Sequence, residues 1–266
     1  MVASPDNAVV VSRHDRHEDL AIFSVAYADG TPLPDFVPGQ YATLGLPEAE
    51  PKDPAQPKLT RRMYSIASPS TQTNTLDFYI TRVEGGALTP SLFDLNPGDR
   101  LYMSGRVGGH FTLSPHAAGR TLVLVATGTG TAPFRSMIHT HRHDPPWAHC
   151  VLIEGCRFAR DLGYQDELEH LAAEHNHLTY LPSVTREPEV GGGGAWQGLR
   201  GRVPGFLEAE RFRELTGRAL DPETCHVYLC GNPAMIDHCE ADLLGRGFVT
   251  QSRKAPAGNL HFERYW

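Results

Sequence analysis

The stretch TLVLVATGTGTAP, residues 121–133, joins an apolar run to a glycine-rich turn and a segment that can begin a helix. This order of strand, turn and helix is typical of a parallel α/β sheet, and the glycines let a phosphate group approach backbone amides. Pro133 takes the place of the last glycine of the GxGxxG pattern and removes one N–H donor. The stretch therefore predicts a parallel sheet, whereas an anion site needs further support.

Apolar runs continue to alternate with helix-length segments towards the end of the chain. The predicted strands are residues 149–155, 178–184 and 225–231, and the predicted helices are residues 133–143, 165–174, a segment that starts near 204, and 233–244. Alternation of this kind predicts helices on both faces of a parallel sheet. The motif CGNP (230–233) repeats the order of strand, tight turn and helix, so two such turns would flank one crevice at the strand ends.

The chain before about residue 113 has a different pattern, with short strand-like segments separated by glycine and proline. These segments are residues 41–46, 63–67, 76–83 and 100–103. Their spacing predicts a small antiparallel β-barrel. The boundary falls near residues 114–119, so we predict a barrel domain over 1–117 and a parallel α/β domain over 118–266. The proline-rich segment 47–60 and the glycine run 191–194 are predicted to be mobile loops.

Length and charge limit the class of protein. The 266 residues suffice for two domains, and 24 Lys and Arg residues against 31 Asp and Glu residues give a net charge of −7. This charge argues against a chain whose main task is binding nucleic acid or an anionic membrane. No apolar run approaches the roughly 18 residues of a membrane span, and the first residues lack a signal-peptide pattern, so we expect a cytoplasmic protein without a membrane segment. The five cysteines lack the spacing of an iron–sulfur cluster or a zinc site.

Two motifs of the predicted barrel indicate an anion site. In RMYS (62–65), the alternation of a strand puts Arg62 and Tyr64 on one face, as it would in any ordinary strand. In GGALTPS (85–91), two glycines precede a threonine suited to cap a helix, with Pro90 at the first helical position. Backbone N–H groups that point outward together there would bind an anion, and a well-capped helix is the plainer interpretation.

Three arginines, Arg157, Arg186 and Arg202, follow predicted strands or loops of the second domain. Because the carboxyl ends of parallel strands lie at one edge of a sheet, their guanidinium groups could converge there. Convergence would favour a phosphate dianion, since arginine forms charge-assisted forked bonds with it. A lone arginine in such a place would more often be a solvated surface residue.

The histidines offer a competing hypothesis, because His139 and His143 lie one helical turn apart and could hold a metal ion. No carboxylate or cysteine accompanies them, and the dipole of a helix favours histidine at its C-terminus. We therefore expect no metal. The cysteines other than Cys230 are interpreted as small apolar residues of strands and a helix.

The order of these motifs resembles that of the ferredoxin–NADP reductases, and most closely the compact bacterial kind that serves ferredoxin or flavodoxin. The motifs that carry the resemblance are PGQY (38–41), RMYSIAS (62–68), GGALTP (85–90), PGD (97–99), GHFTL (109–113), ATGTGTAP (126–133), CGNP (230–233) and ERYW (263–266). They cover nearly the whole chain. The resemblance implies a two-domain flavoenzyme that binds FAD and NADP(H).

The resemblance implies a flavin site in the first domain. Arg62 would pair with the FAD pyrophosphate, Tyr64 would stack on one face of the isoalloxazine, and Ser65 would lie near flavin N5. At the chain end, Tyr265 would cover the second flavin face and Trp266 would lie against the adenine. The other residues implied in FAD binding are Met63, Tyr79, Ile80, Thr81, Ala87, Leu88, Thr89 and, from the second domain, Thr129.

It also implies a nicotinamide dinucleotide site in the second domain. The three arginines match the positions that hold the 2′-phosphate of NADPH in the bacterial enzymes. Further dinucleotide residues are Thr185, Gly231, Asn232 and Pro233. The implied catalytic residues, which would line or close the nicotinamide pocket, are Ser65, Cys230, Glu263 and Tyr265. Among them, Glu263 is expected to handle or orient a proton.

The implied reaction transfers a hydride between NADP(H) and FAD, and single electrons between FAD and ferredoxin or flavodoxin. Two other functions fit the sequence: the flavin reductase component of an oxygenase system, and a non-catalytic flavin-binding sensor module. The missing cluster cysteines disfavour a self-contained oxygenase reductase. We expect a monomer, and the sequence identifies neither the physiological acceptor nor the direction of electron flow.

Overall fold

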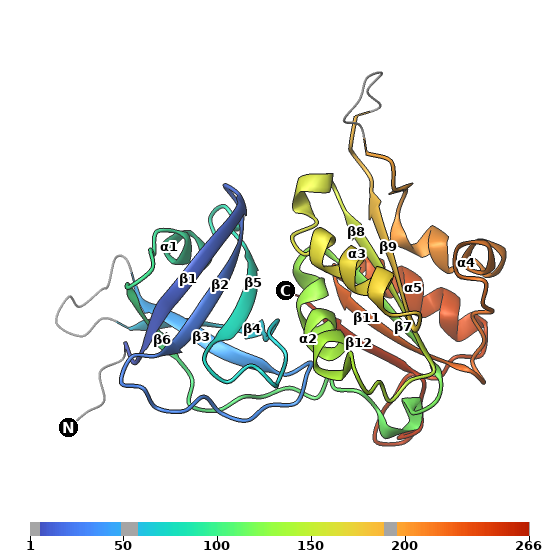
Figure 1. Ribbon diagram of the computed structural model, residues 1–266, viewed down its shortest axis with the longest axis horizontal. Helices are drawn as coiled ribbons and strands as arrows, with labels where there is room; N and C mark the ends of the chain where they lie inside the picture. Colours follow the sequence, from blue (N-terminus) through green and yellow to red (C-terminus); the bar gives the residue numbers. More distant parts are fainter. Residues whose placement is uncertain (1–5, 49–57, 189–195, 266) are drawn as a thin grey trace. The chain divides into compact units, whose positions relative to one another are not determined.

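The computed structural model describes residues 6–48, 58–188 and 196–265 of the chain (Figure 1). Three features of the sequence analysis lie outside these residues. They are the proline-rich segment over 49–57, the glycine run 191–194 and Trp266. The predictions made for them therefore stay predictions. The ends of the predicted loop 47–60 are described and are not loop, because Pro47 pairs with Leu59 and Leu46 with Thr60 in an antiparallel ladder.

The chain divides into two compact units. The first comprises residues 1–112 together with 135–140, and the second comprises residues 113–134 together with 141–266. The division passes through one helix, whose later residues make their contacts within the first unit.

The first unit is a six-stranded antiparallel sheet with one short helix. Its elements are β1 (Ala8–His17), β2 (Leu20–Tyr27), β3 (Tyr41–Pro47), β4 (Leu59–Ser65), β5 (Leu76–Thr81), α1 (Thr89–Phe93) and β6 (Arg100–Met103). The strand order is β4-β3-β6-β1-β2-β5, and the ladders are antiparallel. The predicted antiparallel domain is thus confirmed, whereas β1 and β2 are strands that the sequence pattern did not predict.

The predicted closure of this sheet into a barrel is not observed. Within the described residues, the edge strands β4 and β5 pair only through an isolated bridge between Ile66 and Phe78. Just beyond the bridge, the Ser68 hydroxyl accepts the N–H of Asp77 at 3.1 Å. The Ser68 side chain thus accepts the Asp77 N–H, which a longer β4–β5 ladder would have paired with a backbone carbonyl. The sheet therefore stays open at this edge.

The core of the first unit follows from the period of its strands. In β2 the buried residues Ala21, Phe23 and Val25 alternate with more exposed ones, as a sheet with one buried face requires. They belong to the same apolar cluster as Phe78 of β5 and Leu92 of α1. Burial of α1 in this cluster fixes the position of the turn that precedes the helix.

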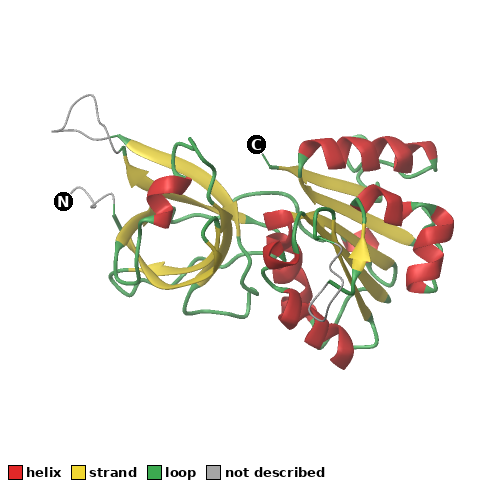
Figure 2. Cartoon of the chain, turned by 90° about the horizontal axis from the view of Figure 1, so that it is seen from above, coloured by secondary structure: helices red, strands yellow, loops and turns green. Residues whose placement is uncertain are grey.

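The second unit is a parallel α/β domain with helices on both faces of its sheet (Figure 2). Its elements are η1 (Pro115–Ala117), β7 (Thr121–Thr127), η2 (Gly128–Gly130), α2 (Thr131–His141), β8 (His149–Cys156), η3 (Ala159–Asp161), α3 (Gln165–Glu174), β9 (Leu178–Val184), β10 (Leu199–Arg200), η4 (Val203–Leu207), α4 (Ala209–Thr216), β11 (Cys225–Gly231), α5 (Pro233–Gly245) and β12 (Leu260–Arg264). The strand order is β10-β9-β8-β7-β11-β12, and the ladders are parallel. The predicted parallel sheet is confirmed.

The central strands of this sheet are buried on both faces, which explains why their sequences are continuous apolar runs. On one face, Val125 of β7 and Ile153 of β8 share an apolar cluster with Phe212 of α4 and Ile236 of α5. The neighbouring residues of β7 and β8 point to the opposite face.

Two helix boundaries differ from the prediction. The segment that starts near Pro204 first forms the 3-10 turn η4, and the α-helix begins only at Ala209. In η4, Phe206 and Leu207 are both buried, so packing of adjacent apolar residues fixes this turn. Helix α2 begins at Thr131, two residues before Pro133, whose fixed φ suits a first helical turn. No helix in the described parts of the chain is both long and apolar enough to span a membrane.

Candidate functional site

In the first unit, the predicted flavin residues come from the ends of β4 and β5 and from the turn before α1. The isolated bridge joins the end of β4 to β5, so the backbone of Tyr64 and Ser65 lies near that of Tyr79 and Ile80. Ser65, Tyr79 and Ile80 are buried, and Thr81 is half-buried. The structure therefore brings together residues that are about 15 positions apart in the sequence.

The RMYS motif offers an aromatic ring and an exposed cation. Burial raises the pKa of the Tyr64 phenol to about 12, and the charge of Arg62 lowers it in part, so the phenol stays neutral at ordinary pH. The Arg62 side chain is exposed and donates to the carbonyl of Arg61 at 2.7 Å. Met63, on the opposite face of the strand, is 64% exposed. An exposed guanidinium of this kind suits a phosphate group.

Thr89 fixes the glycine turn that leads into α1. The Val83 N–H donates to Thr89 Oγ1 at 2.9 Å. A Cβ on Gly86 would lie 2.9 Å from both Thr89 Oγ1 and the Val83 carbonyl oxygen, so the turn has no room for a side chain there. The predicted role of Thr89 as the helix cap is wrong. Leu88 holds the N-cap position without a side-chain bond, because the Thr89 hydroxyl serves the turn instead.

The predicted anion site at the start of α1 is also weakened by the length of the helix. α1 has only five residues, and so short a helix has a small dipole. Ala87 is exposed and Leu88 is buried just before it. Anion binding here would depend on Arg62 and on the amides of the turn.

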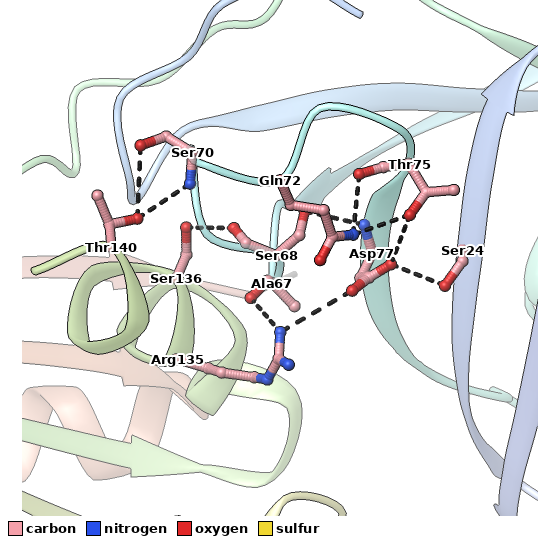
Figure 3. A network of polar contacts seen from close by, with 10 residues as sticks. All are labelled: Ser24, Ala67, Ser68, Ser70, Gln72, Thr75, Asp77, Arg135, Ser136 and Thr140. Atoms are coloured by element: carbon pink, nitrogen blue, oxygen red, sulfur yellow. Dashed lines mark hydrogen bonds and ion pairs between the residues drawn. The ribbon is translucent and has the colours of Figure 1, made fainter. Parts of the chain in front are cut away.

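A polar network directly after the RMYS motif was not predicted (Figure 3). Arg135 donates to the carbonyl of Ala67 at 2.8 Å and lies 3.9 Å from the carboxylate of Asp77. The Ser136 hydroxyl donates to the carbonyl of Ser68 at 2.7 Å. All five residues belong to the first unit. Their contacts fix the backbone that follows Ser65, and their separation in sequence leaves no pattern from which to predict them.

In the second unit, the two predicted turns lie side by side at the ends of the adjacent strands β7 and β11, as predicted. The Asn232 N–H donates to Thr127 Oγ1 at 2.9 Å. A Cβ on Gly130 would overlap the carbonyl oxygen of Cys230, and a Cβ on Gly231 would overlap Thr127. Both positions therefore require glycine, because the two backbones approach each other too closely for any side chain.

The residues around these turns also set the start of the following helix. Asn232 Oδ1 accepts the N–H groups of Ala234 and Met235 at 2.9 and 3.3 Å, which caps α5. Pro233 occupies the first helical position, where no N–H donor is needed. Thr129 lies in η2 and is almost fully buried.

The predicted nicotinamide residues Cys230, Glu263 and Tyr265 lie together at the ends of β11 and β12. Cys230 pairs with Glu263 in the ladder, and the Tyr265 N–H donates to the carbonyl of Gly231 at 3.1 Å. Burial and the negative charge of Glu263 raise the pKa of the Cys230 thiol well above its usual value, although a hydrogen bond with the Tyr265 side chain lowers it. Cys230 is therefore a neutral thiol.

The three arginines follow three neighbouring strands, β8, β9 and β10. The Arg186 N–H donates to the carbonyl of Arg157 at 2.8 Å, so these two backbones are adjacent. Thr185 lies between β9 and Arg186, and its hydroxyl donates to the carbonyl of Cys156 at 3.2 Å. The side chains of Arg157, Arg186 and Arg202 are exposed, and none has a carboxylate partner among the described residues. Their positions fit the predicted phosphate site at one sheet edge.

Glu154 is a residue near the dinucleotide turns that the sequence analysis missed. It lies on β8, is fully buried, and accepts hydrogen bonds from Thr131 and Tyr180. The available signal was a single acidic residue inside the apolar run HCVLIEG. Because a charged group in a buried strand needs hydrogen-bond partners, an acidic residue inside an apolar run predicts a buried polar contact.

No group of three or more His, Cys, Asp or Glu side chains is arranged to hold a metal ion within 6–48, 58–188 and 196–265. His139 lies within α2, and His143 follows the helix. All five cysteines are buried free thiols, which confirms the interpretation of Cys150, Cys156, Cys225 and Cys239 as small apolar residues.

Comparisons with known proteins match both units. A family model described as an oxidoreductase FAD-binding domain matches residues 7–112, and one described as an oxidoreductase NAD-binding domain matches residues 124–241. The chain is 36% identical to ferredoxin–NADP reductase B of Sorangium cellulosum over 230 residues, which cover 86% of this chain and 85% of the relative. The chain belongs to the ferredoxin–NADP reductase family.

Other members of the family agree with this assignment. The flavodoxin/ferredoxin–NADP reductase of Escherichia coli strain K12 is 28% identical, and the match covers 92% of this chain and 93% of the relative. A crystal structure of a ferredoxin–NADP reductase from Neisseria gonorrhoeae with bound FAD and NADP has the same fold, with a TM-score of 0.83 at 22% identity over 99% of this chain and 100% of that chain. The resemblance stated from the motifs, the two-domain fold and the expected cofactors FAD and NADP(H) are thus confirmed.

Proposed function

We propose that the protein transfers a hydride between NADP(H) and a bound FAD and exchanges single electrons with ferredoxin or flavodoxin. The observation that carries the proposal is on the dinucleotide side. Two glycine turns meet at the ends of β7 and β11, and the neighbouring strands β8, β9 and β10 end in exposed arginines. Membership of the ferredoxin–NADP reductase family supports the flavin and the class of protein partner.

Residues 1–117 would bind FAD. The exposed guanidinium of Arg62 suits the pyrophosphate, and the neutral ring of Tyr64 suits stacking on the isoalloxazine. Gly86 is required by the turn itself, because a Cβ there would crowd Thr89 and the Val83 carbonyl. The remaining flavin residues would be Met63, Ser65, Tyr79, Ile80, Thr81, Ala87, Leu88 and Thr89, with Thr129 from the second unit.

Residues 118–266 would bind NADP(H). The adjacent positions of Arg157 and Arg186 and the placement of Arg202 on the next strand end support recognition of the 2′-phosphate. The missing side chains at Gly130 and Gly231 let the two turns pack against each other, and Gly128, where a Cβ would meet nothing within 4 Å, leaves the backbone of its turn open to a phosphate group. Thr185, Asn232 and Pro233 complete the set proposed from the sequence.

Bound FAD would supply the redox chemistry, accepting a hydride from NADPH and releasing electrons one at a time. The residues of the chain orient the reactants and exclude water. Cys230 contributes a small neutral thiol to the nicotinamide pocket, because burial keeps it protonated. Glu263 beside it would hold or orient a proton, Ser65 would contribute a hydroxyl on the flavin side, and Tyr265 would gate the entry of the nicotinamide.

We further propose that the protein works as a monomer in the cytoplasm. Its net charge of −7 means that a small acidic redox protein would need a local basic surface for docking. The exposed Arg61 and Arg62 of β4 offer such a charge next to the proposed flavin residues.

The test is NADPH-driven reduction of purified ferredoxin and flavodoxin from the source cell, with free FMN as a competing acceptor. The proposal predicts that both NADPH oxidation and reduction of one of the two proteins depend on FAD and are faster than reduction of free FMN. Reduction of free flavin alone would instead support the flavin reductase component of an oxygenase system.

A further inference from the structure

Glu154 is the only carboxylic acid among the described residues that is fully buried. It lies near the carboxyl end of β8, where the ladder pairs it with Ala126 of β7 and Pro182 of β9. Neither neighbour carries a charge. A carboxyl group in such a place is unfavourable unless hydrogen bonds satisfy it, and nothing in the proposed hydride transfer requires it.

The partners of Glu154 connect it to the glycine-rich turn. Its two oxygens accept from the Thr131 hydroxyl at 2.7 Å and from the Tyr180 hydroxyl at 2.5 Å. Thr131 is itself fully buried and is the first residue of α2, directly after Gly130. Burial raises the pKa of the Cys156 thiol, two residues farther along β8, and the backbone N–H of Gly128 opposes this rise, so the thiol lies beside the turn. Two buried side chains of β8 thus support the turn of η2 from within the sheet.

Glu154 can change its protonation state near neutral pH. Burial raises the pKa of its carboxyl to about 7, and the bonds from Tyr180 and Thr131 oppose this rise. The titratable groups around it are acidic: Tyr180 on β9, Cys156 on β8, Asp161 of η3, whose charge acts on Cys156, and Glu169 of α3, whose charge acts on Tyr180. No basic side chain of the described residues is among the causes of its shift. A further negative charge nearby would therefore favour the protonated form.

We propose that Glu154 is a proton-binding residue of the dinucleotide site, which takes up a proton when the pyrophosphate of NADP(H) binds at the turn of Gly128–Gly130. This inference rests on the proposed function, because it assumes that the turn binds the pyrophosphate. The carboxyl forms no covalent bond and only gains a proton from solvent. Binding and protonation are linked, so the affinity for NADP⁺ contributed by this group falls as Glu154 ionises with rising pH.

Calorimetry of the FAD-loaded protein with NADP⁺, in two buffers of different ionisation enthalpy, measures the protons taken up on binding. If the bound pyrophosphate raises the pKa of Glu154 by about one unit, the wild-type protein takes up roughly half a proton more than Glu154→Gln at about pH 7.5. The 2′-phosphate of NADP⁺ also titrates near pH 6. Adenosine 2′-monophosphate carries that phosphate without a pyrophosphate, so its proton uptake should be the same in both proteins.

Equal proton uptake with NADP⁺ in the wild type and Glu154→Gln would overturn the inference while leaving the proposed function intact. An absence of NADP⁺ binding by the folded yellow protein would overturn both. If Glu154→Gln does not fold, Thr131→Val keeps the carboxyl and removes one donor. This variant should move the pH at which proton uptake is largest upward, and an unchanged pH would also overturn the inference.

Discussion

The two turns that we assign to phosphate groups are supported in different ways. The flavin-side turn, which lies between Val83 and Thr89, is held by the hydrogen bond from the Val83 N–H to the Thr89 hydroxyl. The helix after it, α1, has five residues. The dinucleotide-side turn, between Thr127 and Thr131, is held by hydrogen bonds to residues far away in the sequence. Thr131 bonds to Glu154, 23 positions away, and Thr127 bonds to Asn232, 105 positions away. The comparison suggests that the first turn is a local structure, whereas the second depends on the whole sheet. Substitutions should therefore disturb the second turn more.

The largest expected effect is the pH dependence that Glu154 gives to the free energy of unfolding. Burial raises its pKa to about 7 from an ordinary 4.5, so the folded state binds this proton more tightly than the unfolded state does. The stabilisation is complete below about pH 4.5 and is lost as the pH rises through about 7. At 1.36 kcal/mol per pKa unit, the loss is about 3 kcal/mol.

Urea unfolding of the wild type and of Glu154→Gln across this pH range measures the effect. The free energy of unfolding of the wild type, relative to the variant, should fall by that amount as the pH rises. A difference between the two proteins that does not change with pH would show that the carboxyl does not titrate in the folded state.

A smaller effect separates two glycines of the same turn. Gly130→Ala puts a methyl group against the Cys230 carbonyl, and should cost about 2 kcal/mol of stability and weaken NADP⁺ binding. Gly128→Ala is the matched control, since a Cβ there meets nothing within 4 Å and only the φ of +54° is strained, at about 1 kcal/mol. Thermal unfolding and NADP⁺ titration check both. Equal losses would mean that contact with β11 does not restrict the turn.

Arg186→Ala should weaken the preference for NADPH over NADH. A charge-assisted contact is worth about 1.5 kcal/mol or more, so KM for NADPH should rise roughly tenfold while KM for NADH changes little. Arg160→Ala removes an arginine that is also exposed but pairs with Asp161, and should leave both values unchanged. Steady-state kinetics with the two cofactors distinguish the outcomes, and equal effects of Arg186→Ala on both would exclude a role in reading the 2′-phosphate.

The smallest effect is expected at the flavin-side turn. Thr89→Val removes the acceptor of the Val83 N–H and should lower the free energy of unfolding by about 1 kcal/mol. It should also slightly increase the loss of FAD on dialysis. Thr89→Ser keeps the hydroxyl and should behave as the wild type. A loss of flavin from Thr89→Val greater than the loss of NADP⁺ affinity from Gly130→Ala would reverse the comparison between the turns.

The sequence allowed much of the second unit to be predicted, because its strands are continuous apolar runs that glycine or proline ends. Residues 178–184 and 225–231 are strands with the predicted bounds. The position of both glycine turns could be predicted for the same reason. β1 and β2 could not, since their burial alternates through polar residues such as Ser12 and Ser24 without a clear turn signal.

The support of the site was harder to predict than its location. The bonds of Glu154 to Thr131 and of Arg135 to Ala67 join residues 23 and 68 positions apart, and no local pattern encodes them. Thr89 has the residue type and position of a helix cap, yet its hydroxyl bonds to Val83, because the turn before the helix offers a competing donor. The local sequence therefore indicates which side chains can form hydrogen bonds, but it does not determine which of the possible partners they bond to.

Adding NADPH to the purified FAD-loaded protein without oxygen shows whether the chain couples NADP(H) to a bound flavin. We expect rapid loss of the visible flavin absorbance with NADPH, and a much slower loss with NADH at the same concentration. A protein that retains FAD and keeps its absorbance unchanged with both cofactors would be a flavin-binding sensor, and would contradict hydride transfer from NADPH to the flavin.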